Sequence, residues 1–340
     1  MKAPTIRDSV LEAHRDFVVF DLHVDVILQQ RLFGYDISKA HRPWMRRQPF
    51  WRHADVPRML EGGYSGVSFG IHYWRKETPK GWVEVQKQLD YMEKVAATDE
   101  RVVLARTAAD IEAAGKSGKL AATAGFEGAH LIDGNLNHID EMAERHGLYL
   151  TLAHFSKNQA CTPGMGKGAN QEDGLTEFGK ALVKKLNDAK MLVDVAHVNE
   201  PGVLDAARAS QAPVIATHTC AKGVHHHARG ITDEGFKAIA ETGGVAGVIF
   251  SPGFLKGKLN ASLDAVVEHA KYIADLVGPE HLALGTDFDG WIPTIPNDIR
   301  DCRDMPAYSQ RLMDAGFSRD EVAGLMGGNL MRVIREVRGA

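Results

Sequence analysis

The amino-acid sequence predicts an α/β protein of the (β/α)8, TIM-type barrel class. Eight short apolar segments are distributed along the 340 residues, amphipathic segments lie between them, and no Pro/Gly/Ser-rich linker or repeat interrupts the pattern. Most of the apolar segments lack polar alternation, which is typical of strands buried on both faces of a parallel sheet. The predicted strands are residues 18–26, 64–73, 121–129, 148–154, 191–197, 212–218, 244–250 and 282–288.

The intervening segments carry helix signals. Residues 81–98, 175–189 and 262–277 place apolar side chains at helical spacing among charges. Ser262 is a suitable N-cap for the third of these helices. Near the C-terminus, the S-x-x-E sequence at 318–321 predicts a capping box, and the glycine pair that follows predicts a break before a last helix.

We interpret residues 1–340 as a single (β/α)8 barrel domain with an inserted rim segment around 27–63. That segment is long for a strand-to-helix connection and contains the basic, aromatic stretch 41–53, which we expect to be a lid or rim over the site or a dimer contact. An open, doubly wound sheet is the alternative fold. It is less favoured because no G-x-G-x-x-G follows the first strand.

Composition limits the classes of partner. The 40 basic and 44 acidic residues give a net charge of −4, which does not favour nucleic-acid binding. The three cysteines are widely spaced and form no C-x-x-C, so neither a disulfide framework nor a thiolate zinc finger is expected. No secretion signal and no run of about 18 apolar residues is visible, so we expect a cytoplasmic protein without a membrane partner. A homo-oligomer is possible.

Histidine and acidic side chains end most of the predicted strands. Because the C-terminal ends of barrel strands meet at one face, residues that are far apart in sequence should converge there. His23 and Asp25 are two apart on a strand, so their side chains point the same way. The strand-end residues are His23, Asp25, Glu127, His154, His197, His218, Asp287 and Asp289.

Five of these residues predict a metal centre. Three imidazoles and two carboxylates suit zinc, and also manganese or cobalt. One catalytic zinc takes three protein ligands, so five ligands fit two metals, with Glu127 as the bridge between the pair at 23–25 and the later His197 and His218. One such histidine alone would more often be an ordinary hydrogen-bonded side chain, but five imidazole and carboxylate side chains gathered at four strand ends favour ligation.

The remaining histidines are given simpler interpretations. His72 is expected to be an ordinary hydrogen-bonded histidine after the second strand, and the triplet 225–227 a solvated or substrate-facing loop, because three consecutive side chains point in different directions. Surface positions are expected for His130, His138, His146 and His281.

Several motifs together resemble the renal or membrane dipeptidase family, which belongs to the amidohydrolase-type, metal-dependent hydrolase barrels. The resemblance runs from about residue 18 to the C-terminal tail. Its motifs are DLHVD (21–25), FEGAHLI (126–132), TLAHFSKN (151–158), GLTEFGKALVKKLNDAKMLVDVAH (174–197), PVIATHT (213–219), RGITDE (229–234), LGTDFDG (284–290) and GGNLMRVIREV (327–337).

The resemblance implies a zinc-dependent dipeptidase with two Zn²⁺ per chain and a dipeptide as its small-molecule substrate, cleaved by a hydroxide that bridges the metals. It implies that His23, Asp25 and Glu127 hold one zinc and that Glu127, His197 and His218 hold the other. It further implies that His154 binds and polarises the scissile carbonyl, Arg229 pairs with the terminal carboxylate, and Asp287 is the acid/base.

One position departs from the family pattern. Gly230 follows Arg229 where the family usually has asparagine, which bears on side-chain preference. Two alternatives stay open: a related amidohydrolase acting on N-acyl amino acids or other small amides and lactones, and a non-catalytic metal-binding protein that kept the fold. The presence of Arg229 and Asp287 beside all five ligands argues against the second.

Overall fold

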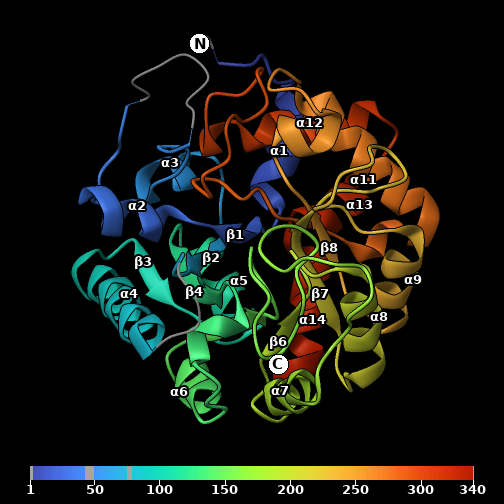
Figure 1. Ribbon diagram of the computed structural model, residues 1–340. Helices are drawn as coiled ribbons and strands as arrows, with labels where there is room; N and C mark the ends of the chain where they lie inside the picture. Colours follow the sequence, from blue (N-terminus) through green and yellow to red (C-terminus); the bar gives the residue numbers. More distant parts are fainter. Residues whose placement is uncertain (1–2, 43–49, 75–78, 340) are drawn as a thin grey trace.

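The strands form one parallel barrel. In the computed structural model, which describes residues 3–42, 50–74 and 79–339, eight strands pair in the order β2-β1-β9-β8-β7-β6-β5-β4, and β2 pairs with β4 to close the circle. Helices surround this central barrel (Figure 1). The barrel strands are β1 (Phe20–Val24), β2 (Gly66–Ile71), β4 (Leu120–Phe126), β5 (Gly147–Thr151), β6 (Leu192–Asp194), β7 (Val214–Thr219), β8 (Ala246–Val248) and β9 (Leu282–Leu284). The predicted fold class and all eight predicted strands are confirmed.

A ninth strand, β3 (Val102–Leu104), was not predicted. It pairs only with the first half of β4, from Val102 opposite Leu120 to Leu104 opposite Ala122, while the other edge of β4 pairs with β2. The barrel therefore closes without β3. Three residues, two of them only partly buried, are too short to give a readable strand pattern.

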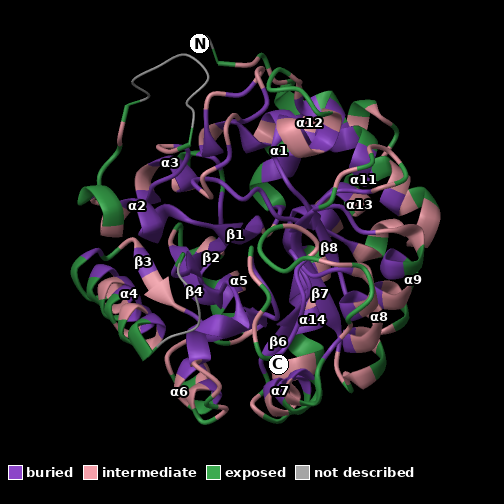
Figure 2. Cartoon of the chain, in the orientation of Figure 1, coloured by how far each residue is buried: buried purple, intermediate pink, exposed green. Residues whose placement is uncertain are grey.

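The helices pack outside the strands with their apolar faces inward, so the centre of the molecule is buried and the outer helix faces are exposed (Figure 2). Their bounds are α1 (Asp8–Asp16), α2 (Val26–Phe33), α3 (Val56–Glu61), α4 (Pro79–Thr98), α5 (Ala108–Lys116), α6 (His138–Glu144), α7 (Glu177–Asp188), α8 (Glu200–Ala209), α9 (Asp233–Glu241), α10 (Pro252–Lys256), α11 (Leu263–Val277), α12 (Met305–Asp314), α13 (Arg319–Ala323) and α14 (Asn329–Arg338). The three helices predicted from periodicity correspond to α4, α7 and α11.

The predicted helix ends are also confirmed. Ser262 accepts a hydrogen bond from the Asp264 amide at the start of α11. Ser318 and Glu321 form a reciprocal capping box at α13. The break between α13 and α14 occurs at Gly327, where a Cβ atom would lie 2.3 Å from the carbonyl oxygen of Val18. This close approach joins the C-terminal helices to the start of β1.

The segment between β1 and β2 contains α2 and α3 and is fixed to the barrel mouth. The buried Asp289 carboxylate, just beyond β9, accepts hydrogen bonds from the backbone amides of His53 (2.8 Å) and Ala54 (3.1 Å). Gln29 in α2 donates to the carbonyl oxygen of Asp289. Most of the basic, aromatic stretch 41–53 lies outside the described residues. Our interpretation of 1–340 as one domain with a rim insertion stays a prediction.

Two smaller expectations concern the cysteines and membrane-spanning helices. Cys161, Cys220 and Cys302 are buried free thiols. Within the described ranges, no helix is both long and apolar enough to cross a lipid bilayer.

Candidate active site

The five predicted metal ligands meet at the C-terminal mouth of the barrel. Oε1 of Glu127 faces three imidazole nitrogens: Nε2 of His197 at 3.0 Å, of His218 at 3.5 Å and of His23 at 3.6 Å. His23 Nε2 also lies 3.2 Å from Oδ1 of Asp25. All five side chains are buried. Residues contributed by four different strand ends therefore enclose one small space.

Positions in, or just after, barrel strands place these groups. His23 lies in β1, Asp25 begins the turn into α2, and Glu127 directly follows β4. His197, beyond β6, has a left-handed backbone with φ of 67°, and Asp287, beyond β9, has φ of 59°. Non-glycine residues in this conformation are uncommon and cluster at functional sites, where the surrounding structure holds them.

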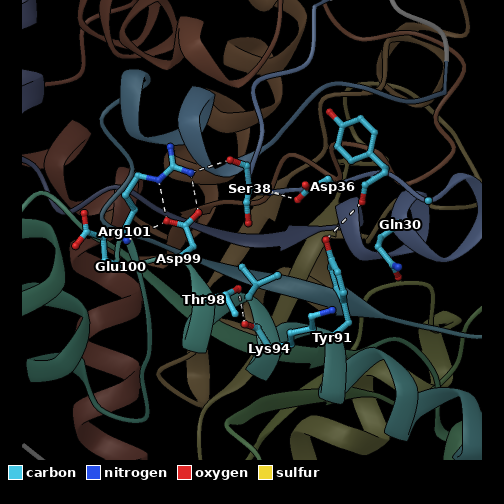
Figure 3. Close-up of a pocket in the computed structure, with 12 residues that line it drawn as sticks. Gln30, Asp36, Ser38, Tyr91, Lys94, Thr98, Asp99, Glu100 and Arg101 are labelled. Atoms are coloured by element: carbon cyan, nitrogen blue, oxygen red, sulfur yellow. Dashed lines mark hydrogen bonds and ion pairs between the residues drawn. The ribbon is translucent and has the colours of Figure 1, made fainter.

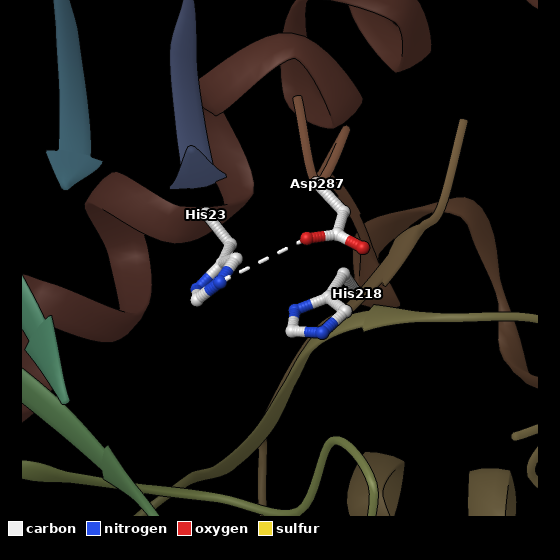
Figure 4. A group of neighbouring side chains, drawn as sticks. All are labelled: His23, His218 and Asp287. Atoms are coloured by element: carbon white, nitrogen blue, oxygen red, sulfur yellow. Dashed lines mark ion pairs between the residues drawn. The ribbon is translucent and has the colours of Figure 1, made fainter. Parts of the chain in front are cut away.

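The ligand atoms fall into two groups that share one carboxylate. His23, Asp25 and Glu127 form one group and Glu127, His197 and His218 form another, with all ligand atoms of each within 4.8 Å of one another. This is the predicted division, with Glu127 common to both. A third group of the same size consists of His23, His218 and Asp287, which point toward one another from three strand ends (Figure 4).

The electrostatics of these residues fit cations. Apart from their 3.2 Å contact with each other, Nε2 of His23 and Oδ1 of Asp25 are buried without a hydrogen-bond partner in the part of the chain that the structure describes. Burial and the neighbouring Asp25 raise the pKa of Glu127 to about 8. Burial also lowers the pKa values of His197 and His218, so both imidazoles are neutral, as metal ligation requires. A pair of divalent cations would supply the positive charge that the two buried carboxylates need.

Hydrogen bonds orient the imidazoles. The Tyr149 hydroxyl lies 2.5 Å from Nδ1 of His23, and the Thr217 hydroxyl lies 3.0 Å from Nδ1 of His218. Both contacts leave Nε2 facing the centre of the site. Asp194 in turn accepts hydrogen bonds from the Thr217 hydroxyl and amide. Such outer contacts fix the ring orientation of metal-ligating histidines in proteins.

The other predicted site residues border the five predicted metal ligands, which we call the ligand cluster (His23, Asp25, Glu127, His197 and His218). His154 Nε2 lies 3.5 Å from Oε2 of Glu127, and burial holds the pKa of His154 well below its usual value. Asp287 Oδ1 lies 3.9 Å from Nε2 of His23, and burial raises the pKa of Asp287 well above its usual value. Arg229 is 3% exposed and donates to the carbonyl oxygen of His218 at 3.3 Å. All eight predicted site residues thus lie in one region.

Arg229 lacks a counter-charge. Among the residues that the structure describes, no carboxylate oxygen lies within 4.0 Å of its guanidinium group, and its Nε has no hydrogen-bond partner. Burial lowers its pKa, while the more distant carboxylate of Asp287 raises it. A buried cation without a carboxylate partner is costly, which makes this guanidinium suited to an anionic ligand.

A cavity of about 600 Å³ opens above the ligand cluster. Its floor is formed by Asp25, Glu127, His154, His197 and Asp287. Its walls are mostly apolar and aromatic, with Tyr73, Trp74, Phe155, Phe254, Trp291, Ile292 and Pro293. A few convergent polar groups beneath apolar walls are the usual features of a small-molecule site.

A larger cavity of about 720 Å³ lies on the side of the barrel, near the end of α2 and along α4. Its Arg101 and Asp99 are already paired with each other: Arg101 donates to both carboxylate oxygens of Asp99 and to the carbonyl oxygen of Ser38 (Figure 3). The described residues that line this cavity include no histidine. The cavity at the barrel mouth therefore differs from this side cavity in its buried charged groups that lack ion-pair partners, and not in having a larger volume.

Two histidines near the site were misjudged from sequence. His130 is 2% exposed rather than a surface residue, lines the cavity and donates through Nε2 to the carbonyl oxygen of Tyr73. His72 is fully buried, and neither ring nitrogen has a hydrogen-bond partner among the described residues, contrary to the expected hydrogen-bonded role. His72 lies just after β2 and His130 just after β4, and this position after a barrel strand was the sequence signal that could have placed both near the site.

An eight-stranded parallel barrel with histidine and carboxylate ligands at its C-terminal mouth defines a class, the amidohydrolase-type metal-dependent hydrolases. Within that class, the chain belongs to the membrane dipeptidase family (Peptidase family M19), whose model matches residues 7–340. The resemblance predicted from the motifs is confirmed. Membership implies a metallo-dipeptidase that binds divalent metal and takes a dipeptide substrate.

Individual relatives agree with this assignment. Dipeptidase tcpJ of Claviceps purpurea (strain 20.1) is 30% identical over 300 residues, which cover 84% of this chain and 69% of the relative. A metallo peptidase of Rhodobacter sphaeroides, solved with a phosphinate mimic of the dipeptide L-Ala-D-Ala, is 25% identical with a TM-score of 0.82, covering 95% of this chain and 100% of that one. The family M19 dipeptidase AC is 27% identical with a TM-score of 0.83, covering 95% and 99%.

Proposed function

We propose that this chain hydrolyses dipeptides with two divalent cations, zinc being the first candidate. His23, Asp25 and Glu127 would hold one cation and Glu127, His197 and His218 the other. The single observation that carries the proposal is that one carboxylate oxygen, Glu127 Oε1, faces three imidazole nitrogens within 3.6 Å. Bound there, the cations would lower the pKa of a water molecule and polarise the scissile carbonyl.

Asp287 would handle the proton. Its carboxyl group lies at the cavity floor beside the ligands, and burial raises its pKa well above the usual value. A carboxyl group with a raised pKa both accepts and returns a proton near neutral pH, which a general base that becomes a general acid must do. Asp287 would therefore take the proton of the attacking water and deliver it to the leaving amine.

His154 would orient the carbonyl group. Because burial keeps the imidazole neutral, one ring nitrogen carries a proton and can donate a hydrogen bond. Its Nε2 faces the ligand cluster, 3.5 Å from Glu127 Oε2. A donor at this place would stabilise the negative charge that develops on the carbonyl oxygen.

Arg229 would bind the free carboxylate of the substrate. The guanidinium is buried beside the ligands and lacks an acidic partner in the described residues, so a bidentate carboxylate would satisfy it. This interaction would confine the enzyme to short substrates, since the terminal carboxylate of a long peptide lies far from most of its bonds. The phosphinate mimic of a dipeptide bound to the Rhodobacter sphaeroides relative supports the same substrate class.

Hydrolysis of L-Ala-L-Ala by purified protein, before and after chelation and zinc return, tests the proposal. We expect loss of activity on chelation and recovery with zinc. Full activity without metal would contradict it. A parallel panel of N-acyl amino acids and lactones tests the related amidohydrolase alternative. Cytoplasmic location and a homo-oligomer stay predictions.

A further inference from the structure

Two tryptophans face each other across one side of the cavity. The rings of Trp74 and Trp291 meet edge to face, with centroids 5.2 Å apart, and both line the cavity. Trp74 is 47% exposed, and exposed apolar side chains that are grouped around a cavity mark ligand-binding grooves. The pair therefore offers an indole-lined wall to a ligand.

Three further aromatic side chains contact Trp291 in this wall. Phe33 stacks on Trp291 with centroids 6.3 Å apart, and Trp51 and Phe50 lie 5.9 Å and 5.6 Å from the same ring. Trp291 itself has a φ of 61° at the end of the tight turn that begins at Asp287. An aromatic wall held from behind loses little conformational freedom when a ligand binds to it.

Topology places the Trp74 side of this wall opposite Arg229, whereas Trp291 follows β9, which is separated from β7 by β8 alone, and reaches Trp74 through their ring contact. In the closed strand order, three strands separate β7 from β2 in either direction, so these two strands are diametrically opposed. Arg229 lies in the connection after β7, and Trp74 follows β2 by three residues. The ligand cluster lies between them. A dipeptide whose carboxylate is held by Arg229 would therefore extend across the ligand cluster toward Trp74 and Trp291.

We propose that Trp74 and Trp291 form a specificity pocket for a large apolar or aromatic side chain on the N-terminal residue of the dipeptide. This inference rests on the proposed function and on the Arg229 interaction. A dipeptide has its carboxylate on the C-terminal residue, so the end that reaches the two indoles is the N-terminal residue. Indole faces and edges bind aromatic rings well in offset or edge-to-face arrangements.

The test compares the metal-loaded enzyme on L-Phe-L-Ala, L-Ala-L-Phe and L-Ala-L-Ala. We expect kcat/KM for Phe-Ala to exceed that for Ala-Phe by about tenfold or more, the discrimination that a hydrophobic pocket provides. Trp74→Ala and Trp291→Ala should each lower the ratio of Phe-Ala to Ala-Ala about tenfold, and Trp74→Phe and Trp291→Phe should retain most of it. Using a ratio removes any general loss caused by disturbing the turn at Asp287.

Trp82→Ala is the matched control, because Trp82 stacks on His138 with centroids 3.8 Å apart and does not line the cavity. Its ratio should equal that of the unsubstituted protein. Preference for Ala-Phe, or unchanged ratios in both tryptophan-to-alanine variants, would overturn the pocket and leave dipeptide hydrolysis in place. Failure of the metal-loaded protein to cleave any of the three dipeptides would instead overturn the proposed function, and the inference with it.

Discussion

Two buried arginines differ in the partners that their guanidinium groups have. Arg58, 1% exposed, donates to Asp55 at 2.8 Å, to Asp301 at 2.9 Å and to the hydroxyl of Tyr35 at 3.1 Å. Arg229 is 3% exposed, and among the described residues its guanidinium group donates only to the backbone carbonyl oxygen of His218, at 3.3 Å. The first guanidinium is part of the fold, whereas the second is suited to a ligand.

The same difference separates the two regions as wholes. Around Arg58, the buried carboxylates of Asp55 and Asp301 have cationic partners. At the barrel mouth, the carboxylates of Asp25, Glu127 and Asp287 lack an arginine or lysine partner within 4.0 Å in the described chain. Burying charge without a partner costs stability, so a protein retains it where a ligand or cation completes the site.

The largest effect should follow from removing the shared ligand. Glu127→Gln deletes the carboxylate that both ligand groups need, so we expect dipeptide hydrolysis to fall by more than about a thousandfold. Metal analysis of the purified variant should find less than one ion per chain. Glu172→Gln, on an exposed loop, is the control and should keep activity and metal. A Glu127→Gln variant with full metal content and normal turnover would contradict the bridging role.

Asp287→Asn should separate proton transfer from metal binding. The amide cannot accept the water proton, so we expect kcat to fall by about two to four orders of magnitude. Metal content should stay near that of the unsubstituted protein, as measured by elemental analysis. Loss of metal would instead make Asp287 mainly a ligand, which its place in the group with His23 and His218 also permits.

Replacing each arginine with methionine compares the two regions directly. Arg58→Met leaves the buried Asp55 without a cationic partner and leaves Asp301 with Arg303 alone, so we expect a loss of about 3–5 kcal/mol in the free energy of unfolding. Arg229→Met removes a buried charge that has no carboxylate partner, so its cost should be below about 1 kcal/mol. Denaturant unfolding of both metal-free variants measures the difference. Equal costs would show that Arg229 also has a structural role.

Arg229→Met should also abolish recognition of the free carboxylate. The unsubstituted enzyme should prefer L-Ala-L-Ala to L-Ala-L-alaninamide, and the variant should lose about ten- to a hundredfold of that preference, the value of a charge-assisted hydrogen bond. Steady-state kcat/KM values for the two substrates measure it. An unchanged ratio would reject the interaction.

The smallest effect concerns a histidine with a purely structural environment. His14 Nε2 donates to the carbonyl oxygen of Gly62 at 3.0 Å, its Nδ1 accepts from the Ser309 hydroxyl at 2.8 Å, and burial lowers its pKa. Because the folded pKa is depressed, the unfolded chain takes up a proton first as the pH falls below about 6.5, and stability is lost in that window.

His14→Gln removes this titration and keeps a donor for Gly62. Thermal unfolding of the metal-free proteins at pH 7.5 and 5.5 should show a fall in Tm smaller by about 2 °C in the variant. Metal-free proteins are used because protons compete with bound metal for the histidines at the barrel mouth, and this competition would add its own pH dependence to Tm. Equal falls in Tm would show that His14 does not contribute to the acid sensitivity.

The barrel and the strand-end histidines and carboxylates could be predicted from sequence because both depend on local pattern, whereas Arg229 was predicted from the family resemblance. Buried parallel strands give continuous apolar runs, and the chemistry of a barrel lies where those runs end, so Glu127 and His218 could be found without coordinates. β3 was missed because three residues, two of them only partly buried, leave no readable pattern.

Other features depend on contacts between distant segments. His130 is buried because its short helical turn packs under the segment after β2, which no local pattern reveals. The contact between Trp74 and Trp291 joins loops after two strands that are far apart in sequence. Among the described residues, the lack of a carboxylate beside the Arg229 guanidinium likewise depends on several elements that are far apart in sequence.

The central claim is that the cluster around Glu127 binds two cations that are needed for dipeptide hydrolysis. Titrating the metal-free protein with zinc, while following bound metal and the initial rate on L-Ala-L-Ala, tests it most directly. We predict that binding saturates at two ions per chain and that the rate reaches its maximum only as the second equivalent binds. A chain that binds no zinc, or one that hydrolyses the dipeptide at full rate before zinc is added, would contradict the account.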